Sequence, residues 1–132
     1  MSATPTTRSL DHLRRRGMDA QVVEKWIPAT NRRQDLFGVI DIVAISDTEC
    51  IGVQTTSATN LSARRTKAEE EPRLARWLKA GCRFELHAWG LKGARGKRKT
   101  YQLTRQVACL TVHGIVWRDE DEDDGYAGLW IV

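Results

Sequence analysis

The residues of this chain best suited to chemistry are oxygen-bearing side chains within two apolar, strand-like stretches, residues 38–45 and 50–56. Asp41 interrupts a run of Val and Ile in the first stretch, and Gln54 lies near the end of the second. A carboxylate among aliphatic side chains is rarely buried without a counter-ion, a substrate or a metal ion beside it. Asp41 is therefore the first candidate for a functional residue, aimed at a metal, a substrate or a counter-ion.

The two stretches are joined by the short polar segment 46–49, which predicts a β-hairpin. Side chains alternate between the two faces of a strand, so Gln54 and Thr56 share one face. Pairing of the two strands is expected to place Asp41 beside them. Carboxylate and amide oxygens are ligands that Mg²⁺ accepts in proteins. The sequence thus predicts an oxygen-rich patch on one face of a sheet.

This hairpin resembles that of the PD-(D/E)XK nuclease superfamily, and within it the Holliday-junction-resolvase-like and phage-type members. The segment Gly-Val-Ile-Asp41 stands where Gly-x-Pro-Asp would be, and Gln54-Thr55-Thr56 stands 13 positions later, where Glu-x-Lys would be. The resemblance implies an α/β fold with a restriction-endonuclease-like core, a mixed central sheet flanked by helices in the order α-β-β-β-α-β. It also implies a Mg²⁺- or Mn²⁺-dependent endonuclease that cuts DNA, branched or duplex, and acts as a homodimer.

Two residues depart from the family pattern. Gln54 keeps a carbonyl oxygen that can bind a metal but lacks the charge of Glu, and Thr56 cannot supply the charge of the missing Lys. Lys67, in a predicted helix, is a candidate to replace that lysine, and otherwise the site is weak or has lapsed. The resemblance implies that Asp41, Gln54 and the carbonyl group of Thr55 form the metal site.

Two further acidic residues are candidates to complete the site. Asp35 precedes the first strand-like stretch, where it either adds a second carboxylate near the metal or caps a turn through its own backbone. Glu24 lies in a predicted strand, where it either reaches the same face as an acidic ligand or pairs with a neighbouring basic residue. Both alternatives stay open at this point.

The charge pattern favours a polyanionic partner. The 132-residue chain carries 21 Lys and Arg against 17 Asp and Glu, for a net charge of +4. Six of those acids lie together in residues 119–124, so the rest of the chain carries a net charge of +10. The acidic run is either a solvated loop or a competitor of nucleic acid for the basic surface. A body this basic suits contact with nucleic acid. The candidate nucleic-acid-binding residues are Arg32, Arg33, Arg64, Arg65, Lys92, Arg95, Lys97, Arg98 and Lys99.

Other classes of protein find little support in the sequence. No apolar run approaches the length of a membrane span, and no signal peptide is evident, so we expect a cytoplasmic protein without a membrane partner. Cys50, Cys82 and Cys109 have no zinc-ligand spacing and predict buried free thiols. No Gly-x-Ser-x-Gly or phosphate-binding Gly-Lys-Ser/Thr motif is present.

The hydrophobic pattern predicts one domain over residues 1–132, with residues 1–6 frayed and residues 107–132 forming a C-terminal extension of undetermined type. The helices are expected at 8–18, 61–70 and from Pro72 onward, and the strands at 20–27, 35–46, 50–56, 83–89 and 100–105. Residues 29–34 and 90–99 are expected to be loops.

Three functions are consistent with these features. The first is a metal-dependent endodeoxyribonuclease of resolvase type. The second is a nucleic-acid-binding module with the same fold and a lapsed metal site. The third is a small phage-encoded interaction protein in which the nuclease fold serves only as scaffold.

Overall fold

The computed structural model describes residues 3–120, and the predicted extension beyond Glu120, including most of the acidic run, lies outside the described residues. Its elements are α1 (Pro5–Arg15), β1 (Asp19–Val22), β2 (Lys25–Ile27), β3 (Arg32–Gln34), β4 (Ile42–Ile45), β5 (Cys50–Ser57), the 3₁₀ turn η1 (Ala58–Asn60), α2 (Leu61–Glu70), α3 (Pro72–Lys79), β6 (Arg83–Lys92), β7 (Thr100–Thr111) and β8 (Gly114–Glu120).

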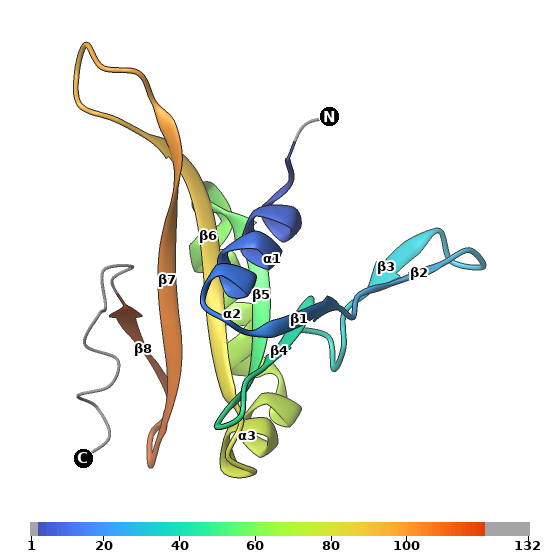
Figure 1. The fold of residues 1–132 in the computed structure, drawn as a ribbon. Coiled ribbons are helices and arrows are strands. Elements are labelled where there is room, and N and C mark those ends of the chain that lie inside the picture. The colour runs from blue at the N-terminus through green and yellow to red at the C-terminus, as the bar shows by residue number, and fades with distance from the viewer. Residues whose placement is uncertain (1–2, 121–132) are drawn as a thin grey trace.

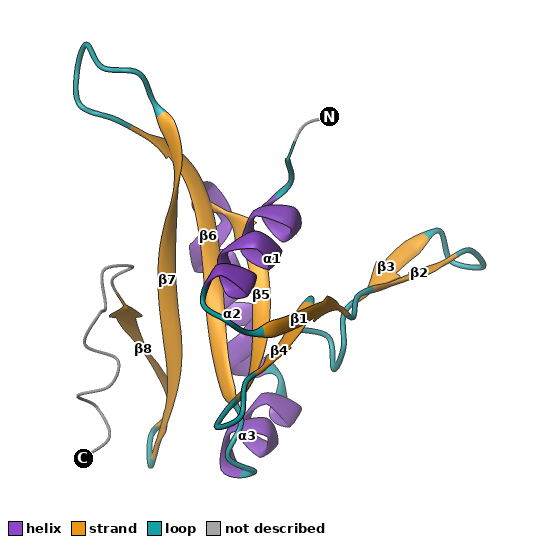
Figure 2. Ribbon diagram, viewed as in Figure 1, coloured by secondary structure: helices purple, strands orange, loops and turns teal. Residues whose placement is uncertain are grey.

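A mixed six-stranded sheet forms the centre of the molecule, in the order β1-β4-β5-β6-β7-β8 (Figures 1 and 2). Strands β5 and β6 are parallel, and every other neighbouring pair in this sheet is antiparallel. The parallel pair requires a crossover, which α2 and α3 provide. Strands β2 and β3 form a separate two-stranded ribbon. The expected α/β class with a mixed sheet is therefore confirmed.

The sheet has a helix layer on each face, as the alternation along β6 shows. Phe84 and Leu86 pack into the core beneath α2 and α3, together with Ala68 and Leu74 of those helices. On the other face, Leu13 of α1 packs with Ile42, Ala44, Ile51 and Val53. Strands β4 and β5 thus bury one face against α1, and β6 buries the opposite face against α2 and α3, which fixes the register of these strands.

Helix α1 begins earlier than its sequence pattern indicates. Thr4 is the N-cap residue, its hydroxyl accepts a bond from the backbone N–H of Thr7, and Pro5 occupies the first turn. The expectation that residues 1–6 are frayed is therefore wrong for Thr4, Pro5 and Thr6, while Met1 and Ser2 lie outside the described residues.

One predicted strand is divided in the structure, and one predicted loop contains a strand. Residues 20–27 were expected to form one strand but form parts of β1 and β2, which belong to different sheets. Residues 29–34 were expected to form a loop, yet Arg32–Gln34 pairs with β2 as β3. A three-residue ribbon carries too little hydrophobic alternation for its strands to be distinguished from a loop in the sequence.

The predicted strand over residues 35–46 is also shorter, because only Ile42–Ile45 pairs as β4. Residues 35–40 form a tight turn closed by a bridge between Leu36 and Ile40, with Phe37 and Gly38 at positive φ angles of 54° and 76°. Glycine tolerates this left-handed conformation, which explains Gly38. The turn brings Asp35 back toward Asp41.

Strands β6 and β7 are longer than predicted and project beyond the sheet as a twisted hairpin, with residues 93–99 at its tip (Figure 1). Part of the C-terminal extension is now assigned, because residues 107–120 complete β7 and form β8. Asp119 and Glu120, the first two residues of the acidic run, lie in β8, where they accept hydrogen bonds from Gln106 and Arg105 respectively.

A buried polar network joins α1 to β6 and β7. Glu85 is fully buried and accepts hydrogen bonds from Arg16 at 3.0 Å and Arg105 at 3.1 Å. His87 bridges Glu85 and Ser9, each at 2.9 Å. Burial lowers the pKa of His87, so its ring is neutral, donates to Glu85 and accepts from the Ser9 hydroxyl. This Ser-His-Glu arrangement is enclosed by protein and ties the helix to the sheet.

In the described part of the chain, no helix is long and apolar enough to cross a membrane. All three cysteines are half-buried free thiols. Burial and the neighbouring Cys82 thiol raise the pKa of the Cys50 thiol.

Candidate metal centre

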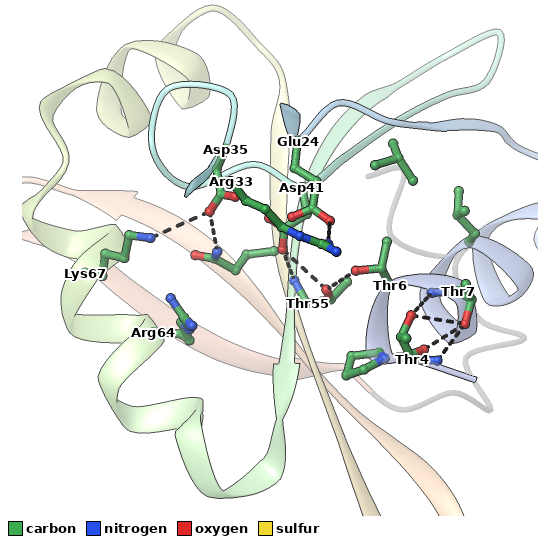
Figure 3. A pocket seen from close by; sticks show the side chains of 14 residues that line it. Thr4, Thr6, Thr7, Glu24, Arg33, Asp35, Asp41, Thr55, Arg64 and Lys67 are labelled. Carbon is green, nitrogen blue, oxygen red and sulfur yellow. Dashed lines mark hydrogen bonds and ion pairs between the residues drawn. The ribbon is translucent and has the colours of Figure 1, made fainter. Parts of the chain in front are cut away.

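A cavity of about 650 Å³ opens where β5 runs past the start of β4. Its walls come from the N-terminal half of α1, the end of β1, the ends of the β2–β3 ribbon, the residue before β4, strand β5 and helix α2. Figure 3 shows the acidic side chains grouped together, with α2 on one side of them and the threonines of α1 on the other. The cavity therefore collects polar side chains that are far apart in the sequence.

Three carboxylates converge in this cavity. Ligand oxygens of Glu24, Asp35 and Asp41 all lie within 4.8 Å of one another. The turn over residues 35–40 returns Asp35 to Asp41, and the backbone carbonyl of Asp41 accepts the N–H groups of Val23 at 2.8 Å and Glu24 at 3.3 Å. Backbone hydrogen bonds thus hold the three positions together. Glu24 reaches the other two acids and also pairs with Arg33, and Asp35 both lies in the cavity and accepts the N–H of Gly38 in its turn.

Asp41 is the most deeply buried of the three acids, with 5% of its surface exposed. Its carboxylate accepts hydrogen bonds from the backbone N–H of Thr55 at 2.9 Å and from the Thr55 hydroxyl at 3.3 Å. Burial, a hydrogen bond to the Asp35 carboxyl and the charges of Asp35 and Glu24 raise the pKa of Asp41 to about 7, against the opposing effect of the Thr55 N–H. A divalent cation would relieve this repulsion.

The neighbours of Asp41 differ from those expected from strand alternation. Asp41 was predicted to lie beside Gln54 and Thr56, but it bonds to Thr55 because it precedes the regular part of β4. Thr56 is buried and lies outside the set of residues that line the cavity. The structure therefore does not bring Thr56 to the carboxylates.

Gln54 supplies a fourth oxygen at the cavity. Its side-chain amide donates to Asp35 at 3.2 Å, which fixes the amide group against the acidic cluster. The amide oxygen is buried, and no described residue donates a hydrogen bond to it. A buried acceptor without a partner is costly, and a cation at this point would satisfy it. Three carboxylates and one amide oxygen form a donor set that fits Mg²⁺ or Mn²⁺.

Three cations surround the acidic cluster. Arg33 donates to Glu24 at 2.9 Å, and the Lys67 ammonium lies 3.6 Å from Asp35. Arg64 also lines the cavity and makes no ion pair within residues 3–120. Arg64 and Lys67 are one turn apart on α2, so both reach the same cavity.

The remaining predicted basic residues lie elsewhere. Arg65 points away from the cavity and donates to Gln106 of β7 at 3.3 Å. Lys92, the last residue of β6 before the tip of the hairpin, donates to Thr104 of β7. The others are exposed: Arg32 on the β2–β3 ribbon, and Arg95, Lys97, Arg98 and Lys99 at the tip of the β6–β7 hairpin.

The sequence did not indicate that α1 contributes to the cavity. Thr6 bonds through its hydroxyl to Thr55 at 3.1 Å, and so joins the helix terminus to the residue that holds Asp41. The Thr-Pro-Thr-Thr segment is a recognisable helix start, and that was the only available signal. The segment is far from β5 in the sequence, so its contact with Thr55 could not be predicted from any local pattern.

Comparison with protein-family models, with curated proteins and with solved structures found no match to this chain. Its function is therefore argued from the geometry of the cavity and from the charge of the surrounding surface.

Proposed function

We propose that this protein is a Mg²⁺- or Mn²⁺-dependent endonuclease of the PD-(D/E)XK type that hydrolyses DNA phosphodiesters. The observation that carries the proposal is the convergence of the Glu24, Asp35 and Asp41 carboxylates in one cavity, with Asp41 buried. An acidic cluster alone is common on protein surfaces. Here the Gln54 amide nitrogen also donates to Asp35, and its buried oxygen accepts no hydrogen bond from residues 3–120, which favours a cation at the cavity.

The chain topology supports the proposal. Helix α1 is followed by the antiparallel strands β1, β4 and β5, and the α2–α3 crossover leads to β6, parallel to β5. This is the α-β-β-β-α-β order that the sequence resemblance implies, with the β2–β3 ribbon inserted between the first two strands of the sheet. The candidate ligands lie where β4 and β5 part, at the position of the family motif.

The roles of the residues follow from their places in the cavity. Asp41, Glu24, Asp35 and the Gln54 amide oxygen would hold the divalent ion, which when bound supplies charge neutralisation and an acidified water. Arg64, which lines the cavity and has no ion pair among residues 3–120, binds a non-bridging oxygen of the scissile phosphate. Thr55 keeps Asp41 oriented through its N–H and hydroxyl donors.

Lys67 takes the role of the lysine that the family pattern has at the position of Thr56. Its ammonium group lies at the cavity, 3.6 Å from Asp35, with the side chain 45% exposed. A Lys one turn beyond Arg64 on α2 brings a positive charge to the same space from the neighbouring element rather than from β5. The developing negative charge on the phosphate is stabilised equally by a cation from either element.

Two basic extensions support a DNA partner. The β2–β3 ribbon and the β6–β7 hairpin extend from the body on opposite sides of α1, whose first turn lines the cavity (Figure 1). Their exposed Lys and Arg side chains suit contact with backbone phosphates on both sides of a cut site. Duplex and branched DNA both provide such phosphates. Both are therefore used as substrates in the assay, and the oligomeric state of the protein is measured alongside.

The direct test is cleavage of labelled four-way junction, flap and linear duplex DNA with Mg²⁺, with Mn²⁺ and with EDTA. We expect metal-dependent cutting by the wild type. We expect Asp41→Ala to reduce the rate at least about a thousandfold while DNA binding persists, because a ligand and not a phosphate contact is lost. Asp47→Ala, which removes the same charge from an exposed turn, is the matched control. Cleavage unchanged by Asp41→Ala would overturn the assignment.

A second candidate function, a binding module with a lapsed metal site, is favoured by one specific feature, the replacement of the family's Glu-x-Lys by Gln54-Thr55-Thr56. It predicts DNA binding without cutting in either metal. The two functions share the basic surface and differ only at the cavity.

Neutralising the tip of the β6–β7 hairpin tests that shared surface. The triple substitution Lys97→Gln, Arg98→Gln, Lys99→Gln is expected to weaken duplex binding about tenfold or more at low salt and to make the dependence of log Kd on log salt less steep by about 2 to 3. All three side chains are exposed, so the fold should be retained. Fluorescence anisotropy between 50 and 200 mM salt measures both effects, and an unchanged slope would exclude the hairpin from the DNA contact.

A further inference from the structure

The β2–β3 ribbon is inserted between two of the three carboxylates. Glu24 immediately precedes β2, and Asp35 immediately follows β3. Between them the chain carries Lys25, Arg32 and Arg33 and no acidic residue. Trp26, which pairs with Arg33 across the ribbon, is 51% exposed. A basic ribbon with an exposed aromatic side chain therefore begins and ends at the candidate metal ligands.

Arg33 connects the ribbon to the metal site directly. Its guanidinium donates to the Glu24 carboxylate at 2.9 Å, while Glu24 is one of the three acids whose oxygens lie within 4.8 Å of one another. The Glu24 side chain is only 15% exposed, whereas that of Arg33 is 69% exposed. The carboxylate is thus fixed in the cavity, and its partner can be reached from solvent.

From this contact, and resting on the function proposed above, we propose that Arg33 is an exchangeable internal cation. In the free protein it pairs with Glu24; when DNA lies along the ribbon, a backbone phosphate takes the guanidinium, and Glu24 becomes available to the divalent cation. Arg33 is a positioning residue in this scheme, acting on the metal through Glu24. Its role couples arrival of the DNA to loading of the metal.

The exchange has a simple electrostatic basis. A carboxylate that pairs with a guanidinium has less affinity for a second cation, since the two cations repel each other and share the same oxygen atoms. Phosphate matches the fork of a guanidinium as well as carboxylate does. Most of the Arg33 side chain is in water, so little burial opposes its transfer. Because linkage is reciprocal, DNA must then tighten metal binding by the same factor by which metal tightens DNA binding.

Arg32 provides a matched control within the same ribbon. It has the same charge, is exposed and lies one residue away, and no acidic side chain of residues 3–120 pairs with it. Any general effect of removing a positive charge near the cavity appears in both Arg32→Gln and Arg33→Gln. An effect that passes through Glu24 appears only in Arg33→Gln.

The experiment measures Mn²⁺ affinity by electron paramagnetic resonance, without reference to cleavage. In the absence of DNA, we expect Arg33→Gln to bind Mn²⁺ about five- to tenfold more tightly than wild type, and Arg32→Gln to bind within about twofold of it. A slowly hydrolysed phosphorothioate duplex should bring the wild type up to the affinity of Arg33→Gln, with little further change in that variant.

Two results would count against the proposal in distinguishable ways. Equal Mn²⁺ affinity in wild type, Arg32→Gln and Arg33→Gln, with binding still lost in Asp41→Asn, overturns the role of Arg33 and leaves the metal site intact. Mn²⁺ binding that is absent from the wild type, or unaffected by Asp41→Asn, overturns the metal site itself and with it the proposed function.

Discussion

Asp41→Asn is expected to raise the melting temperature of the metal-free protein at pH 8. Burial and the neighbouring acids hold the pKa of Asp41 at about 7, far above that of an aspartate in the unfolded chain. The native state therefore keeps a proton that the unfolded state has already released. The stability that this proton contributes is fully present below about pH 4 and is lost as the pH rises through 7.

The neutral amide of Asn avoids this loss. It has nearly the same shape, and its oxygen can still accept the N–H of Thr55 that holds Asp41 in place. We expect Asp41→Asn to melt about 5 °C higher than wild type at pH 8 in EDTA, with the difference shrinking steadily as the pH is lowered toward 5. Differential scanning calorimetry over this pH range measures the effect.

The control for this prediction is Asp47→Asn, at an exposed turn position, which should show no pH-dependent difference from wild type. Addition of Mn²⁺ should reverse the order, because the ion stabilises the wild type and not the variant. A variant less stable than wild type at every pH would contradict the pKa assignment. A residue that destabilises the free protein is a common sign of a site selected for binding.

Glu85→Ala is expected to destabilise the protein by roughly 3–5 kcal/mol, the range measured when one partner of a buried ion pair is removed. The Glu85 side chain is fully buried and is the common acceptor for Arg16, Arg105 and His87. Without it, the Arg105 guanidinium, at 7% exposure, is left in the interior with only a long contact of 3.5 Å to Glu120. An uncompensated charge in this position is more costly than the missing contacts themselves.

Urea unfolding of Glu85→Ala, compared with Glu49→Ala, measures the effect. Glu49 pairs with Arg83 at 2.9 Å at a partly exposed position, so its loss should cost less than about 1 kcal/mol. If Glu85→Ala does not fold, Glu85→Gln keeps the shape and part of the hydrogen bonding and should show an intermediate loss. Equal stabilities of the Glu85 and Glu49 variants would contradict the importance of the buried network.

The same network determines how the free energy of unfolding decreases at acid pH. Burial lowers the pKa of His87, and burial with the charges of Arg16 and Arg105 lowers that of His12 to about 4, so both rings are neutral in the native state. His87 and the arginines hold the pKa of Glu85 below its usual range. The stability from all three groups is complete above about pH 6.5, begins to fall as histidines of the unfolded chain protonate, and falls further below about pH 4.5.

The local elements were largely predictable from sequence, because each depends on near neighbours in the chain. The turn at residues 46–49, the start of α2 after Asn60 and the alternation of Phe84 and Leu86 along β6 all follow from local propensity and hydrophobic period. Asp41 was identified for a similar reason, since a charged group within a Val and Ile run stands out in any single window of sequence. Gln54 was identified as a candidate ligand only from its spacing of 13 positions from Asp41, which matches the family pattern.

The assembly of the site depended on contacts between distant segments, which no local pattern records. A short turn with two positive φ angles, and not a continuous strand, returns Asp35 to Asp41. The backbone of Asp41 fixes Glu24, and Asp41 bonds to Thr55 and not to Thr56 because it lies just before the paired residues of β4, which begins at Ile42. The sequence by itself determined which side chains can bind a metal or a phosphate. Only the tertiary structure decided which of them meet, because strand register, a left-handed turn and the packing of α1 and α2 against the sheet are properties of the whole fold.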